Sequence, residues 1–127
     1  MITFAVASKK AVENLEAAKI LRDKKSFNNA SVSRAYYAAA QTTAAFLLHH
    51  KQFPQKPNHA KVQISLGNLL RKNYPKHQDL TDDLTNLESL RYDADYENRE
   101  MTPKIAQQCC KLASKLKNDL LQLVKTP

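Results

Sequence analysis

The sequence predicts an all-α protein, an antiparallel bundle of four or five helices that forms a single domain over residues 1–127. Three observations support this. Glycine is almost absent, with only Gly67 in the chain, and there is no tryptophan. Sheet proteins usually need more glycine in their turns and more β-branched residues. Apolar residues recur three and four positions apart, which is the period of an amphipathic helix. Breaks near residues 25–29, 52–58, 73–77 and 97–102 divide this pattern.

The first two helices are expected over residues 8–24 and 29–51. One apolar stripe marks the first helix and consists of Val12, Leu15, Ala18 and Leu21. The second helix is apolar on its flanks as well as on its stripe, and it is rich in alanine. We therefore expect the second helix to be the most buried and to pack closely through small side chains.

Proline and asparagine separate the third and fourth helices. Pro54 and Pro57 cannot lie inside a helix, so the third helix is expected to begin after them and to cover residues 58–72. A second break, at residues 73–75, contains another proline and precedes a fourth helix over residues 78–95.

The fifth helix is expected over residues 102–124. Thr102 is typical of an N-cap, and Pro103 is typical of the first helical position. The connections between all five helices are short, which favours antiparallel neighbours.

The charge is unevenly distributed along the chain. Its net value is +8, but residues 1–78 hold 13 Lys/Arg against 3 Asp/Glu, whereas residues 79–100 hold 2 against 8. A basic surface with one acidic band is typical of a protein that contacts nucleic acid or another polyanion. Two alternatives remain open: the charges serve only solubility, or the two zones pair with each other in a dimer.

Cysteine usage and hydropathy bear on the compartment. The two cysteines, Cys109 and Cys110, are adjacent, and neighbours on a helix point about 100° apart, so no disulfide is expected between them. Their spacing matches no metal motif, and no metal or cofactor is expected. The amino terminus lacks a signal-peptide pattern, and no apolar run approaches the roughly 20 residues of a membrane span. We expect a cytoplasmic protein without a membrane association.

The most unusual polar cluster lies at the end of the fourth helix, over residues 90–98. It combines an arginine, three carboxylates and two tyrosines, namely Arg91, Tyr92, Asp93, Asp95, Tyr96 and Glu97. Arg91 and Asp95 are four positions apart, so they share a face and can pair. The alternative interpretation is an exposed salt bridge at a fraying helix end.

A second cluster lies in the second helix, where Ser33, Arg34, Tyr36 and Tyr37 interrupt a run of alanines. An arginine in a buried helix is costly unless a carboxylate accompanies it. Residues 79–100 are the only dense source of carboxylates. We therefore expect Arg34 to pair with Asp93 or Asp95, either as a structural link between the second and fourth helices or as part of a polar site at their junction.

The two clusters together resemble the HEPN superfamily. The resemblance rests on Ser-Arg-Ala-Tyr-Tyr-Ala-Ala at residues 33–39, on His59, and on Leu-Arg-Tyr-Asp-Ala-Asp-Tyr at residues 90–96. Small stand-alone HEPN proteins carry similar motifs in this order. The resemblance implies a helical bundle that often forms homodimers. It also implies a prokaryotic toxin–antitoxin or defence setting, in which the partner is a minimal nucleotidyltransferase acting as antitoxin.

Active members of that superfamily are metal-independent ribonucleases, and their motif is an arginine followed, after four to six residues, by a histidine. Here four residues separate Arg91 from Tyr96, so a tyrosine stands where that motif has its histidine. A tyrosine has an ordinary pKa near 10 and is a poor general base at neutral pH. Arg91 and Tyr96 are the candidate catalytic residues; the candidate binding residues are Arg34, Tyr37, His59, Asp93 and Asp95.

Three functions stay open at this stage. In the first, the chain binds RNA, a nucleotide or a nucleotidyltransferase without catalysis. In the second, it is an active metal-independent ribonuclease toxin. In the third, it is a purely structural helical dimer. His59 has its own alternative role, as a capping or core histidine at the start of the third helix.

Overall fold

The computed structural model describes residues 2–24, 27–97 and 99–125. Within these ranges the protein consists of five α-helices and one short 3₁₀ helix, with no strand, as the sequence predicts. The elements are α1 (Phe4–Arg22), α2 (Asn28–His49), α3 (His59–Asn73), η1 (Pro75–His77), α4 (Asp79–Tyr96) and α5 (Pro103–Lys125). None of these helices is long and apolar enough to cross a membrane.

The helix ends follow local capping chemistry. At α3 the side chain of Asn58 accepts a hydrogen bond of 2.8 Å from the backbone N–H of Lys61. At α1 the hydroxyl of Thr3 accepts a 3.2 Å bond from the N–H of Val6. The expected start of the first helix, at residue 8, is therefore several residues late. Nothing between Thr3 and that position interrupts a helix, so the cap sets the start.

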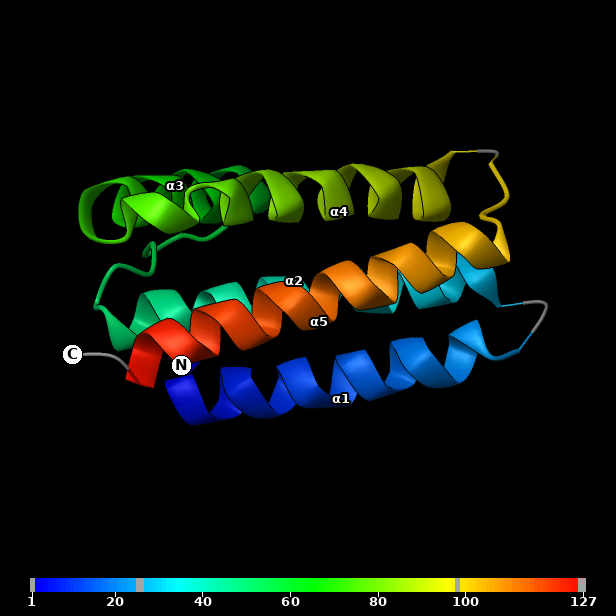
Figure 1. Cartoon of the computed structure of the whole chain (residues 1–127), viewed down its shortest axis with the longest axis horizontal. Helices are drawn as coiled ribbons and strands as arrows, with labels where there is room; N and C mark the ends of the chain where they lie inside the picture. Colours follow the sequence, from blue (N-terminus) through cyan, green and yellow to red (C-terminus); the bar gives the residue numbers. More distant parts are fainter. Residues whose placement is uncertain (1, 25–26, 98, 126–127) are drawn as a thin grey trace.

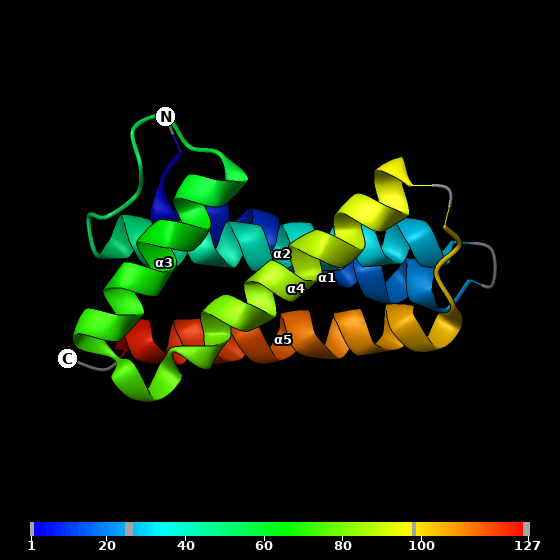
Figure 2. The same cartoon turned by 90° about the horizontal axis from the view of Figure 1, so that it is seen from above.

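Three helices lie side by side, and α3 and α4 cover one face of them (Figure 1). The chain runs antiparallel from α1 to α2 and from α4 to α5, whereas α2 and α5 run in the same direction (Figure 1). Seen from above, α4 crosses α2 and α5 obliquely (Figure 2). This crossing places the carboxyl end of α4 over the first half of α2.

The core is built around α2, as its alanine-rich sequence predicts. Its buried side chains include Val32, Tyr36 and Phe46, which belong to one large apolar cluster with residues from the other four helices. The many buried alanines of α2 let its neighbours approach closely. Polar groups enter the core as well: Ser31, Thr42 and Thr43 bury hydroxyls, Tyr36 buries a phenol, and Arg91 is the one buried charge among the described residues.

Candidate functional site

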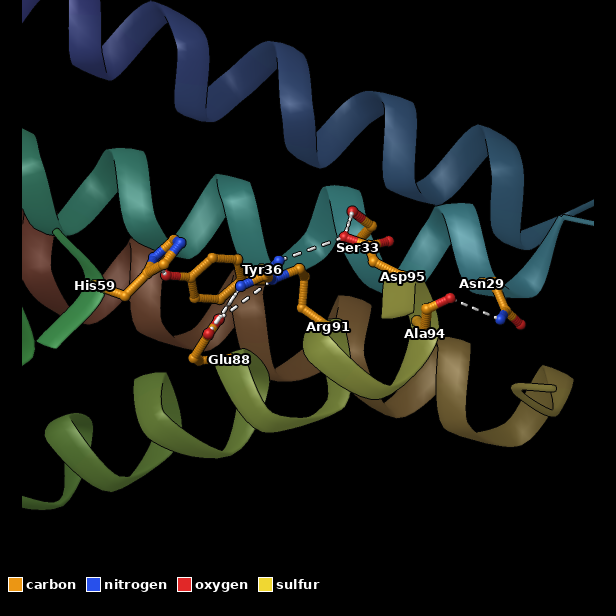
Figure 3. Close-up of polar contacts among 8 residues, drawn as sticks. All are labelled: Asn29, Ser33, Tyr36, His59, Glu88, Arg91, Ala94 and Asp95. Atoms are coloured by element: carbon orange, nitrogen blue, oxygen red, sulfur yellow. Dashed lines mark hydrogen bonds and ion pairs between the residues drawn. The ribbon is translucent and has the colours of Figure 1, made fainter. Parts of the chain in front are cut away.

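Arg91 is the centre of the polar site. Its residue surface is only 4% exposed, and its side chain points from α4 toward α2 (Figure 3). Nε and Nη2 donate to the Glu88 carboxylate over 2.8–3.2 Å, and Nη1 lies 3.6 Å from Oδ2 of Asp95. Residues three before and four after an arginine share its helix face, so α4 supplies both acceptors itself. The guanidinium charge is therefore matched by carboxylates on its own helix.

Aromatic rings surround the same guanidinium. Its Cζ atom lies 5.4 Å from the ring centroid of Tyr36, 5.9 Å from that of Tyr37 and 5.5 Å from that of Tyr96. These distances are within the range of cation–π attraction. Burial alone would lower the pKa of Arg91, but the hydrogen bond and charge of Glu88 outweigh it, and the pKa is raised above its ordinary value. Arg91 is a fixed positive charge.

Tyr36 links this arginine to His59. Its hydroxyl is hydrogen-bonded to Nδ1 of His59, the first residue of α3 (Figure 3). Burial, followed by the charge of Glu88, raises the pKa of Tyr36 well above its ordinary value. The hydroxyl thus keeps its proton and can donate a hydrogen bond to Nδ1 of His59.

Further contacts fasten the end of α4 to α2. The Ser33 hydroxyl donates to Oδ2 of Asp95 over 3.2 Å. Asn29 donates to the backbone carbonyl of Ala94 at 3.0 Å (Figure 3). It also donates to the backbone carbonyl of Arg99 at 3.0 Å. The same amide accepts a 2.8 Å bond from the backbone N–H of Met101. Asn29 therefore holds the segment that leaves α4, which keeps the Arg91 site in register with α2.

The expected partnership of Arg34 is wrong. Arg34 is exposed, and its Nη1 donates to Oδ1 of Asn14 on α1 over 3.2 Å. Asp93 instead pairs with Arg99 at 2.9 Å, and Asp95 pairs with Arg91. Successive helix positions turn by about 100°, so the positions that face α4 leave Arg34 directed toward α1 and solvent. Water solvates its charge there, and no carboxylate is required.

A groove adjoins the Arg91 site between α2 and α3. We call it the Tyr37–His59 groove; its volume is about 400 Å³, within the size range of small-molecule sites. It is lined by Ile2, Tyr36, Tyr37, Ala40, Gln41, Ala44, Phe53, Pro57, Asn58, His59 and Val62. Its walls are largely apolar, with a tyrosine ring and an imidazole among them.

Gln41 is the residue of this groove that the sequence did not single out. Within the described part of the chain, its Oε1 is buried and has no hydrogen-bond partner. Leaving a buried acceptor unpaired costs free energy, so this oxygen, in a residue that lines the groove, is available to a donor of a ligand or of water. The available signal was a single glutamine one turn after Tyr37, among alanines.

The structure thus assembles most, but not all, of the predicted site. Arg91, Tyr96, Tyr37 and Asp95 lie together, and His59 joins them through Tyr36. Arg34 faces α1, and Asp93 turns to Arg99. The described residues contain no group of three or more His, Cys, Asp or Glu side chains that could hold a metal ion.

Sequence comparison gives one result. Residues 6–123 match the family described as the HEPN domain, which is nearly the whole chain. No curated protein matches the sequence.

Proposed function

The chain belongs to the HEPN domain family, and from this premise we propose that it binds RNA or a nucleotide in the Tyr37–His59 groove without cleaving it. The observation that carries the proposal is the groove itself. It places an aromatic ring, an imidazole and an unpaired amide oxygen around a largely apolar hollow. Nucleobases stack on aromatic side chains and form hydrogen bonds along their edges, so these groups suit a base.

Arg91 argues against cleavage by the arginine of the motif. A ribonuclease arginine must offer donors to the charge that develops on the phosphate. Nε and Nη2 of Arg91 donate to Glu88, Nη1 lies 3.6 Å from Asp95, and the residue is almost fully buried, so its donors face carboxylates of its own helix. Tyr96 stands where active relatives have a histidine. Arg91 therefore holds the rings of Tyr36 and Tyr37 in the wall of the groove, and we do not expect it to stabilise a reacting phosphate.

The charge around the groove supports a polyanionic ligand. Lys56 and Lys61 are exposed and flank Pro57 and His59 in the sequence. All lining residues of the groove belong to residues 1–78, the part of the sequence that holds the basic excess. Lysine attracts phosphate as a point charge, without base preference. These side chains would hold the backbone of an RNA while a base enters the groove.

Binding is tested with a short, fluorescently labelled single-stranded RNA in the presence of a chelator. We expect Tyr37→Ala to weaken binding roughly tenfold or more, because stacking on one aromatic ring contributes about 1–3 kcal/mol per base. Tyr37→Phe keeps the ring and should bind nearly as the wild type does. Phe27→Ala, which removes an exposed ring outside the groove, is the matched control. Equal binding by all four proteins would remove the groove from consideration.

Metal-independent ribonuclease activity is the second candidate, and one observation favours it. His59 is joined through the Tyr36 hydroxyl to the ring that packs on Arg91, so one tyrosine connects an imidazole with the motif arginine. Histidine can exchange a proton with a ribose hydroxyl near neutral pH. Robust RNA cleavage in chelator that His59→Asn abolishes would establish the enzyme and overturn the binding-only proposal.

We also propose two protein partners. The first is a second copy of this chain, docked at the carboxyl end of α4, where Tyr92 and Tyr96 are 49% and 67% exposed with ring centroids 5.2 Å apart. The second is a nucleotidyltransferase acting as antitoxin in a toxin–antitoxin or defence system, as the resemblance implies. Co-purification with the product of a neighbouring nucleotidyltransferase gene, where there is one, tests the second partner.

A further inference from the structure

We propose that the Tyr37–His59 groove selects adenine, and that Gln41 is the residue that reads the base. The inference rests on the proposed function, because it names the ligand of the same groove. It makes Gln41 a specificity-determining residue of a site that otherwise recognises shape and charge. The ligand class is an adenine nucleotide or an unpaired adenosine of an RNA.

The first argument is the unpaired amide. Oε1 of Gln41 is buried without a partner in the described part of the chain, although the residue lines the groove. The last torsion of a glutamine is broad, so a small turn presents this oxygen to the hollow. A ligand N–H donor there would satisfy an acceptor that the free protein leaves unpaired. Such a group gains more from a ligand than an acceptor that water already solvates.

The second argument is the match between an amide and an adenine edge. A glutamine side chain has an acceptor and a donor in one plane, and adenine has an amino N–H beside a ring nitrogen acceptor. These two edges pair through two hydrogen bonds, the common glutamine–adenine arrangement. A planar base that stacks on Tyr37 would present such an edge to Gln41, which lies four positions further along the same helix face.

The third argument excludes the other bases. Among the polar residues of the lining, Tyr36 and His59 are bonded to each other and Asn58 caps α3. The lining around Gln41 is otherwise largely apolar and includes Ala40, Ala44, Phe53 and Val62. If one edge pairs with Gln41, uracil and cytosine each keep a carbonyl group without a partner, and guanine keeps an unpaired amino group. Burying such a group unpaired costs free energy. Adenine also keeps ring nitrogens and one amino hydrogen unpaired, but it has no carbonyl group, the strongest acceptor among these bases, so we expect it to have the lowest desolvation cost at this wall.

The test is competition against the labelled RNA by three mononucleotides: AMP, the 5′-monophosphate of purine riboside and UMP. The purine riboside differs from adenosine only in lacking the amino group. We expect AMP to compete at about tenfold lower concentration than either alternative, as one satisfied buried hydrogen bond predicts. With Gln41→Leu, AMP should lose its advantage over the purine riboside nucleotide, because leucine offers neither the acceptor for the amino group nor the donor for the ring nitrogen. Gln108→Leu, on the exposed side of α5, is the matched control.

The other possible results distinguish failure of the adenine inference from failure of the proposed function. Equal competition by AMP and the purine riboside nucleotide, or an unchanged AMP preference in Gln41→Leu, would overturn the inference. If the RNA binds and Tyr37→Ala weakens it, but no mononucleotide competes, the proposed function stands and the adenine inference fails. If neither RNA nor any mononucleotide binds, both fail. Circular dichroism of Gln41→Leu verifies that the fold is retained.

Discussion

Arg91 illustrates how a buried charge is tolerated in a small helical core. Transfer of a guanidinium out of water costs several kcal/mol, and only a complete set of partners offsets that cost. Glu88, Asp95 and the faces of three tyrosine rings provide the set. Removing one member of a buried pair leaves the other charge uncompensated, so the loss exceeds the value of the pair itself.

We therefore expect Arg91→Ala to lower the free energy of unfolding by about 3–5 kcal/mol. Urea titration followed by circular dichroism measures the loss. Arg34→Ala is the matched control, because it also removes an arginine, but an exposed one that donates to Asn14. Its free energy of unfolding should fall by less than about 1 kcal/mol. Similar losses for the two variants would contradict the burial argument.

Sequence reasoning reached part of this residue-scale picture. The pairing of Arg91 with Asp95 follows from a four-residue spacing, and the structure confirms it. Glu88, three positions before Arg91, satisfies the same spacing rule, but the sequence does not tell which of the two carboxylates bonds the arginine more closely. Arg34 was misplaced because α2 is apolar on nearly every side, so periodicity cannot tell which face α4 covers. Gln41 was missed because its unpaired oxygen becomes evident only from packing.

At the scale of single helices, α5 carries the two cysteines on its buried side. Burial, followed by the neighbouring Cys110, raises the pKa of Cys109 to about 11, and both thiols are free. The thiolate is the reactive form, so at pH 8 only about one Cys109 in a thousand is reactive.

We expect a thiol-specific chromogenic disulfide reagent to label neither cysteine of the native chain at pH 8. In denaturant both should react, and rapid native labelling would contradict the packing of α5.

The carboxyl end of α2 provides a pH dependence. Burial, followed by the adjacent His49, lowers the pKa of His50 below its ordinary value. Between the lowered pKa and the ordinary value near 6.5, the unfolded chain binds more protons on this ring than the folded chain does. The free energy of unfolding therefore rises with pH across that interval, and the contribution is lost as the pH falls through it.

We expect His50→Gln to flatten the pH dependence of stability between pH 8 and pH 5.5. Urea midpoints of the two proteins at several pH values measure the difference, which should shrink toward acid pH. Parallel curves for the wild type and the variant would contradict the lowered pKa of His50. The hydroxyl of Tyr74 lies 3.4 Å from Nε2 of His50, and glutamine can retain a hydrogen bond there.

Helix boundaries were the most predictable feature at this scale. Prolines and caps such as Asn58 act locally, so the sequence alone places the breaks near α3 and before α5. The relative directions of distant helices are less accessible. Short connections predict that neighbours along the chain are antiparallel, but they do not predict that α2 and α5 run in the same direction (Figure 1). That arrangement depends on which apolar faces fit together.

For the whole molecule, ion pairs within the chain explain part of the segregation of charge, beside the contacts that we propose with a partner. Lys115 on α5 lies 3.1 Å from Asp83, 3.9 Å from Asp79 and 3.6 Å from Asp119. The amino end of the acidic α4 is thus partly neutralised within the chain. At its carboxyl end Asp93 and Asp95 are likewise paired with arginines, but two tyrosine rings, Tyr92 and Tyr96, remain exposed there. A self-association surface is better supported at this end.

We expect the wild-type protein to sediment as a dimer at micromolar concentration, and the double variant Tyr92→Ala/Tyr96→Ala to sediment as a monomer. Exposed tyrosines are frequent anchors of protein interfaces, and truncating such anchors commonly costs 2 kcal/mol or more, roughly a thirtyfold loss of affinity. Ile20→Ala removes a comparably exposed apolar side chain on α1 and should leave the dimer intact.

If the monomeric double variant still binds RNA, the groove does not need the dimer in order to bind its ligand. A wild-type protein that sediments only as a monomer would contradict the dimer, and a double variant that remains dimeric would move its interface away from the end of α4.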